Sequence, residues 1–250
     1  MPVATVVASP TVWDWSRHDG PAMTASTDDS CRPAGVDLAD EIRALVADVN
    51  RLAPGVDGLL EARRLVFEAR QALEGPVRRR WYEVPVDEID EDLEARLRTE
   101  AGDHSLFRGR RNPLAPPLVV SSEFDDDGPF VTGSVRLDRC REGPPERLHG
   151  GYLAGLFDDV LSGVPSLVDM GPAVTARLAI RYRSATPLDV DLRFEARVVR
   201  HSGRRLVARA RCVVPGGDRA TAEAEALFVA VPAARSQEGR PGEGSRRGDG

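Results

Sequence analysis

Apolar and polar residues alternate along most of residues 117–231, and a single helical pattern interrupts the alternation. A period of two indicates strands that bury one face and expose the other. The expected strands cover residues 117–125, 129–138, 173–183, 190–200, 205–214 and 219–231. Short connections between such runs are typical of an antiparallel sheet. The chain therefore predicts one antiparallel sheet with one helix of about fifteen residues inserted after its second strand.

The last two expected strands indicate what the sheet covers. Small or apolar residues alternate along their expected inner face: Leu206, Ala208, Ala210, Cys212 and Val214, then Ala222, Ala224, Ala226 and Phe228. Folding this hairpin about residues 215–218 places Arg211 near Glu223 and Arg209 near Glu225, as favourable cross-strand pairs. Small inner residues allow a helix to lie close to a curved sheet, so we expect the sheet to wrap around the helix.

The helical pattern opens with two glycines in residues 143–163, "GPPERLHGGYLAGLFDDVLSG". Backbone N–H groups in the first turn of a helix have no internal partner and lie at the positive end of its dipole. His149, Gly150 and Gly151 can therefore present donors to a developing oxyanion. A tight corner between loop and helix is the structural alternative.

Asp158 follows Gly151 by seven residues, close to two turns, so both lie on one face of the helix with Gly155 and Ser162. A carboxyl group on a covered face should have a raised pKa, as a general base or nucleophile requires. Asp159 lies about 100° around the helix, and we expect it to be solvated or paired.

Seven residues of helix span about 10 Å, too far for Asp158 to act at the start of its own helix. A second copy of the chain would bring its carboxylate to this terminus. Two-fold symmetry then gives two sites per dimer.

Residues 37–100 show helical periodicity, with polar faces that carry no chemistry beyond ordinary solvated charge. We expect a helical extension there that serves packing or dimer formation, and an irregular connection over 101–116. Residues 1–36 and 233–250 are polar and aperiodic, so we expect disordered tails around a main domain at 117–232.

The formal net charge of −6 argues against general nucleic-acid binding. The charge is uneven, however, because ten arginines between Arg177 and Arg211 face only three acidic residues. Three widely spaced cysteines suggest neither disulfides nor a zinc site and fit a reducing cytoplasm. The first thirty residues lack a basic, apolar leader, and no run reaches the roughly 18 apolar residues of a membrane span.

The stretch "GPPERLHGGYLAGLFDD" and the following "VTARLAIRYRSATPL" and "RFEARVVRHSGRRLVARARC" resemble the phenylacetate-degradation-type hotdog acyl-CoA thioesterases. The ordered features are His-Gly-Gly, an acid nine positions after the histidine, a hydroxyl residue opening the next strand, and Tyr-x-x-x-x-Pro. The resemblance covers about residues 110–232. It implies an α+β hotdog fold, a dimer or dimer of dimers, and hydrolysis of acyl-CoA without metal or organic cofactor.

Carried over by the resemblance, Asp158 is the catalytic acid, Gly151 with Gly150 polarises the thioester carbonyl, and His149 shapes the loop. Thr175 supplies a hydroxyl that orients water or the carboxylate. The segments that line the path of CoA supply the expected substrate-binding residues: Tyr182, Arg183, Arg200, Gly203, Arg204 and Arg205. Arginine suits the phosphates of CoA, although solvated loop charge explains the 200–205 turn equally well.

One departure from the family concerns Gly143, which stands where some relatives carry an amide side chain. The main alternative to a thioesterase is a hotdog protein that binds or senses acyl-CoA without cleaving it. The chain has neither the G-x-S-x-G elbow of serine hydrolases nor an HExxH metal motif.

Overall fold

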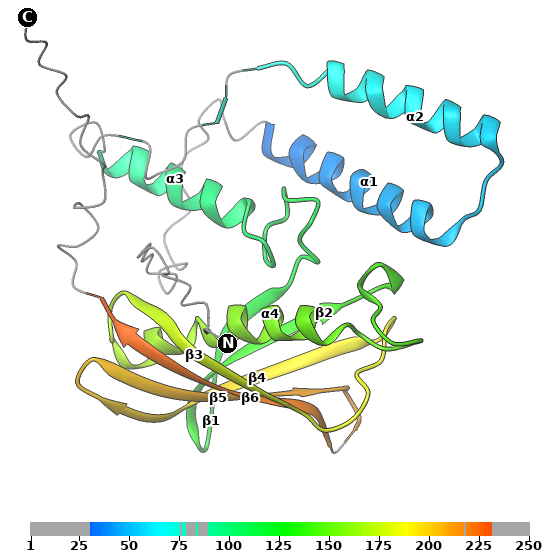
Figure 1. The fold of residues 1–250 in the computed structure, drawn as a ribbon. Coiled ribbons are helices and arrows are strands. Elements are labelled where there is room, and N and C mark those ends of the chain that lie inside the picture. The colour runs from blue at the N-terminus through cyan, green and yellow to red at the C-terminus, as the bar shows by residue number, and fades with distance from the viewer. Residues whose placement is uncertain (1–30, 76, 79–83, 85–89, 218, 232–250) are drawn as a thin grey trace, which may run out of the picture.

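The computed structural model describes residues 31–75, 77–78, 84, 90–217 and 219–231, and it has an antiparallel sheet wrapped around one helix (Figure 1). The strands are β1 (Val119–Asp125), β2 (Gly128–Arg136), β3 (Ala173–Tyr182), β4 (Asp191–Ser202), β5 (Arg205–Val213) and β6 (Ala220–Ala230). The helices are α1 (Cys31–Arg51), α2 (Val56–Gln71), α3 (Glu91–Asp103) and α4 (Gly150–Leu161), with short 3-10 turns η3 (Arg139–Arg141) and η4 (Val164–Val168). The expected α+β class, with α4 between the second and third strands, is confirmed.

The six strands follow the order β1-β2-β4-β5-β6-β3, and every neighbouring pair is antiparallel. The predicted register of the last hairpin is correct, since Arg209 lies opposite Glu225 and Arg211 opposite Glu223. Arg209 forms the expected ion pair with Glu225 at 3.0 Å. Arg211 instead pairs with Glu195 of β4 at 2.6 Å. A residue inside a sheet has neighbours on both sides, and here the second neighbour is the ion-pair partner.

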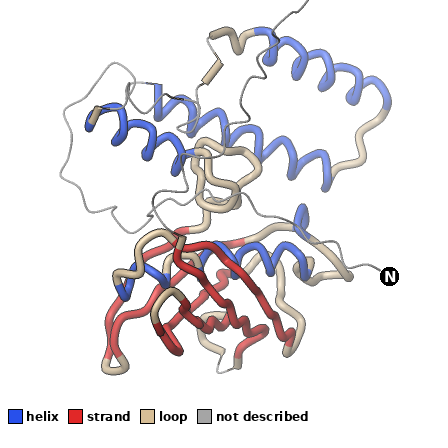
Figure 2. Tube along the Cα trace, turned by 60° about the vertical axis from the view of Figure 1, so that its left-hand side comes forward, coloured by secondary structure: helices blue, strands red, loops and turns tan. Residues whose placement is uncertain are grey.

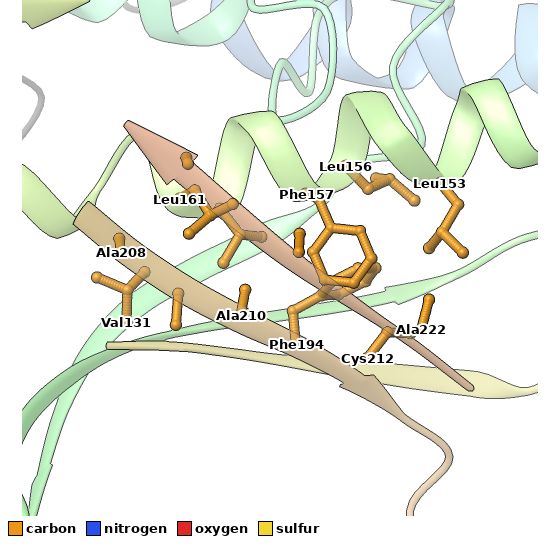
Figure 3. Close-up of a cluster of buried hydrophobic side chains, with 14 of the residues drawn as sticks. Val131, Leu153, Leu156, Phe157, Leu161, Phe194, Ala208, Ala210, Cys212 and Ala222 are labelled. Carbon is orange, nitrogen blue, oxygen red and sulfur yellow. The ribbon is translucent and has the colours of Figure 1, made fainter. Parts of the chain in front are cut away.

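The core lies between α4 and the concave face of the sheet (Figure 3). Leu153, Leu156, Phe157 and Leu161 of α4 are buried against the strands. The rings of Phe157 and Phe194 meet edge to face, with centroids 5.1 Å apart. Because the facing strand residues are mostly small, the helix lies close to the sheet, as the alternation of alanines predicts.

Gly133 of β2 allows the closest of these approaches. A Cβ atom at this position would lie 2.5 Å from the Val160 Cγ2 atom. That distance is well inside van der Waals contact, so α4 could not pack here against any other residue without moving.

The N-terminal helices lie on the side of α4 that faces away from the sheet (Figures 1 and 2). Helix α1 begins at Cys31, whereas we expected a disordered tail up to residue 36, so that boundary is wrong. Residues 1–30 and 232–250 lie outside the described residues. Arg43 attaches α1 to the segment after α3 by donating to the carbonyl oxygen of Arg110 at 2.8 Å. Arg32 attaches α1 to the last residue of α3 through an ion pair with Asp103 at 2.8 Å.

The connection between α3 and β1 contains turns without regular structure. It starts later than predicted, however, because α3 continues to Asp103. This connection crosses α4, and its contacts there affect the candidate site.

Candidate active site

The start of α4 is capped by His149. The His149 Nδ1 atom accepts a hydrogen bond from the Gly151 N–H at 3.1 Å. Nδ1 is therefore unprotonated in this arrangement, and a neutral ring would carry its proton on Nε2. The expectation of a bare donor at Gly151 is thus wrong for the chain as it stands. Since the His149 side chain is exposed, rotation of the ring would free the Gly151 N–H.

The loop before α4 is held by main-chain hydrogen bonds. The N–H of His149 donates to the carbonyl oxygen of Arg141 at 2.8 Å, and the N–H of Gly143 donates to that of Arg147 at 2.9 Å. A Cβ atom at Gly143 would lie 2.9 Å from the His149 Cα atom. This close approach explains the departure from the family pattern, because a side chain at 143 would displace the backbone of His149.

Tyr182 joins the end of β3 to the start of α4. Its hydroxyl donates to the carbonyl oxygen of Gly150 at 2.8 Å. A Cβ atom at Gly150 would lie 3.2 Å from that hydroxyl oxygen, so glycine fits this contact. The structure therefore brings together four expected site residues, namely His149, Gly150, Gly151 and Tyr182.

Asp158 lies two turns further along α4 and is half-buried. Its Oδ1 atom is buried and has no hydrogen-bond partner within the described part of the chain. A buried carboxylate oxygen without a donor is costly and needs an explanation, which can be a catalytic role or an absent ligand.

The face of α4 that carries Gly155 and Ser162 is covered by the chain itself. A Cβ atom at Gly155 would lie 2.3 Å from the Phe107 Cζ atom, so the Phe107 ring occupies the space that glycine leaves. Arg108 donates to the Ser162 Oγ atom at 3.2 Å. The part of this face at Gly155 and Ser162 is therefore closed to a partner helix by residues of the same chain. The aperiodic connection carries no signal in the sequence that reveals this contact.

Asp159 is paired, as expected. Its carboxylate forms an ion pair with the Arg108 guanidinium, and each side chain is only 18% exposed. Burial raises the pKa of Asp159, and the cation of Arg108 opposes that rise. Arg108 therefore offsets part of the cost of burying a carboxylate directly beside Asp158.

Thr175 lies near the start of β3, at the far end of that strand from Tyr182. It faces Phe228 and precedes a register shift in the pairing of β3 with β6. Thr175 lies seven positions before Tyr182 in the strand, which corresponds to about 23 Å. One chain therefore keeps Thr175 and the glycine end of α4 apart.

Arginines surround a hollow of about 420 Å³ on the outer face of the sheet. Its lining residues are Arg177, Arg200, Ser202, Arg205, Val207 and Leu227. The sequence pointed to Arg200 and Arg205 but missed Arg177 as a site residue. The alternation along β3 could have identified Arg177, because it turns this side chain outward beside the last hairpin.

The other expected substrate-binding residues do not line this hollow. Arg183 pairs with Glu223 at 2.5 Å, and Arg204 donates to the carbonyl oxygen of Ala230 at 2.8 Å. Gly203 occupies the turn between β4 and β5 with a φ of 55°, which favours glycine.

Two further properties hold for the part of the chain that the structure describes. No group of three or more His, Cys, Asp or Glu side chains is placed to hold a metal ion there. None of the helices there is long and apolar enough to span a bilayer.

Comparison with known proteins agrees with the expected resemblance. Residues 146–221 match the family model of the thioesterase superfamily. A crystal structure of a thioesterase superfamily protein is 26% identical, covers 78% of this chain and 94% of its own, and has a TM-score of 0.60. A hypothetical thioesterase from Streptococcus pneumoniae TIGR4, solved with coenzyme A, is 23% identical over 44% of this chain and 87% of its own, with a TM-score of 0.38. The PaaI protein from the phenylacetic acid degradation operon of E. coli is 15% identical over 45% and 82%, with a TM-score of 0.40.

No curated protein matches the sequence. The expected hotdog fold and the expected relationship to thioesterases are confirmed by the family match and by the first of these structures. The 78% of this chain that the first structure covers is more than the segment from β1 to β6. The structural similarity therefore extends into the N-terminal helical region.

Proposed function

We propose that this chain, which carries a thioesterase superfamily domain, hydrolyses acyl-CoA thioesters to a free acid and coenzyme A. The superfamily match supports hydrolysis of thioesters in general. The finer assignment gives Asp158 the role of base or nucleophile and gives the Gly150–Gly151 helix end the role of oxyanion site. The site lies between two copies of the chain, in a dimer or a dimer of dimers.

The separation of the site residues within one chain supports the shared site. Asp158 lies about 10 Å along α4 from Gly151, and Thr175 lies at the opposite end of β3 from Tyr182. If α4 helices of two copies run antiparallel, Asp158 of one copy faces the Gly150–Gly151 end of the other. Thr175 then approaches the same carboxylate and can orient it or the water.

The observation that carries the proposal is the buried Oδ1 atom of Asp158, which has no hydrogen-bond partner among the described residues. A structural aspartate in this position would be expected to have a donor. An oxygen without one can accept the proton of a water molecule or attack a carbonyl carbon.

The reaction balances by either route. As a base, Asp158 takes a proton from water while the hydroxide adds to the thioester carbon. The helix-end N–H groups hold the resulting oxyanion. When the oxyanion collapses, the C–S bond breaks and Asp158 passes its proton to the CoA thiolate. As a nucleophile, Asp158 forms an acyl anhydride and releases the thiolate, and water then hydrolyses the anhydride. His149 must release the Gly151 N–H when this group binds the oxyanion.

In this proposal the arginine-lined hollow binds the phosphates of CoA. Arg177, Arg200 and Arg205 converge there on a surface that also offers the Ser202 hydroxyl. Guanidinium groups suit phosphates because they donate paired hydrogen bonds and stay charged. Of the remaining expected residues, Tyr182 supports the helix end, Gly203 shapes the turn, and Arg183 and Arg204 fix neighbouring segments.

The test is release of free thiol from a panel of short, long and aromatic acyl-CoA substrates. Asp158→Asn keeps the shape of the side chain and should lower kcat by about 100-fold or more, the scale of losing a base. Asp169→Asn is the matched control, because Asp169 is exposed and has a left-handed backbone that asparagine tolerates. Unchanged turnover in Asp158→Asn contradicts the role of Asp158. Tight binding of acyl-CoA without any thiol release would favour the binding or sensing alternative.

A further inference from the structure

Helix α2 has no buried residue along its sixteen positions. Five of its large apolar side chains share one face, and all are well exposed: Val56, Leu59, Leu60, Val66 and Phe67. Phe67, the largest of these side chains, is 58% exposed. An isolated helix of about this length is marginal in water, and most helices in proteins owe their stability to packing of an apolar face. The face of α2 therefore needs a cover.

Helix α1 carries a second uncovered apolar face. Leu38, Leu45, Val49 and Leu52 recur at helical spacing, and each is exposed. The other side of α1 holds the buried Ala39 and the Arg43 that attaches the helix to the main domain. The exposed face thus points away from the domain that carries the sheet.

The charges on these two faces are opposite and equally spaced. On α1, Glu41 and Asp48 border the apolar face, seven residues apart. Asp48 also forms an ion pair with Arg51 of its own helix at 2.8 Å. Both side chains of that pair are more than half exposed, so a second arginine can still approach the carboxylate. On α2, Arg63 and Arg70 lie within the apolar face, also seven residues apart. Seven residues correspond to about 10 Å along a helix. Two helices packed side by side can therefore match both acids with both arginines at once.

Within one chain these faces do not cover each other, because both remain exposed in the same structure. Figures 1 and 2 show α1 and α2 as two separate helices joined by a short loop. Arg64 lies outside the apolar face and pairs with both Glu61 and Glu68 of its own helix. Arg63 and Arg70 lie within the apolar face, so their charges select its partner.

We propose that α1 of one copy packs against α2 of a second copy, and that the second copy's α1 packs reciprocally against the first copy's α2. Such an exchange is self-complementary, as contacts around a two-fold axis must be. It buries both apolar faces and places Glu41 and Asp48 against the partner's arginines. The occupant of the α2 face is therefore another copy of this chain.

The experiment measures amide hydrogen exchange along α2 in the full-length chain and in charge-reversed variants. The first variant carries Arg63→Glu with Arg70→Glu, and the second carries Glu41→Arg with Asp48→Arg. Each variant places like charges at both reciprocal contacts. Co-expressed with different affinity tags and purified through both tags, the two variants restore opposite charges at every contact between unlike copies. A chain with all four substitutions restores them in every pairing.

In the unmodified protein we expect α2 amides to exchange on the order of 100-fold more slowly than an unstructured peptide. Each charge-reversed variant should lose most of this protection, and the doubly tagged complex and the fourfold variant should regain it. Glu74→Arg, which reverses a charge just beyond the C-terminal end of α2, is the matched control and should keep the protection, because a cation is tolerated at that end of a helix.

Three results would overturn the proposal. One is unprotected α2 in the unmodified protein, and another is protection that persists in both charge-reversed variants. The third is recovery in the fourfold variant alone, with no recovery in the doubly tagged complex or no such complex at all. That outcome would mean that α1 closes onto α2 of its own chain. None of these readouts depends on thioester hydrolysis.

Discussion

Replacement of Arg108 by leucine should destabilise the protein by an amount that depends on pH. Arg108 holds the buried carboxylate of Asp159, and both side chains are only 18% exposed. Removing one partner of a buried ion pair typically costs about 3–5 kcal/mol, because an uncompensated charge remains. We expect about 3 kcal/mol near neutral pH, at the lower end of this range, since some solvent reaches the pair.

The sign of the pH dependence follows from the pKa of Asp159. Burial raises this pKa above the ordinary value of 3.8, and Arg108 works against the rise. An acid whose pKa is raised on folding contributes stability at low pH and loses it as the pH increases through the folded-state pKa. Without Arg108 the folded-state pKa rises further. The destabilisation by Arg108→Leu should therefore be full at neutral pH and shrink as the pH falls towards 3.8.

The measurement is urea denaturation of both proteins at one protein concentration, near pH 8 and near pH 5. The double variant Arg108→Leu with Asp159→Leu removes both charges and should recover most of the lost stability, because apolar replacements of buried pairs are often neutral. An equal loss at both pH values would refute the electrostatic reasoning. So would a double variant as unstable as Arg108→Leu alone.

Two further predictions concern packing and thiol chemistry. Gly133→Ala should lower the free energy of unfolding by about 1–3 kcal/mol through overpacking, because its Cβ would lie 2.5 Å from the Val160 Cγ2 atom. Adding Val160→Ala should relieve part of this loss in thermal or urea unfolding. Losses that simply add in the double variant would contradict the contact. Burial raises the pKa of Cys212 to about 11, so this thiol should not react with a thiol reagent at neutral pH until the protein unfolds. Cys31, which is exposed, should react at once, and a labelled Cys212 in the folded protein would be inconsistent with its place in the core.

Much of the sheet could be predicted from the sequence, because alternation reports burial directly. The alanines of β5 and β6 face α4 as their period requires. The partner of Arg211 could not be predicted, since a hairpin identifies only one of the two flanking strands. Glu195 on the other strand lies opposite the same arginine and binds it.

The candidate site could be predicted only in part. Spacing along one helix identifies the face that holds Asp158, and the glycines identify where that helix begins. The cover over Gly155 comes from Phe107, which lies in an aperiodic connection whose path no local pattern specifies. The cap of Gly151 by His149 depends on the orientation of an exposed ring, which sequence does not determine. The assignment of Asp158, Thr175 and the helix end to catalysis stays a prediction until the variants are measured.

The connection that follows α3 can change in length more freely than the strands of the sheet. Its residues Phe107 and Arg108 contact the side of α4 that faces away from the sheet. The connection contributes no strand to the six-stranded sheet. An insertion or deletion in this segment can therefore alter what lies over the Asp158 turn without shifting the register of any strand. The segment that covers α4 can therefore vary, by evolution or by engineering, while the sheet and α4 keep their arrangement.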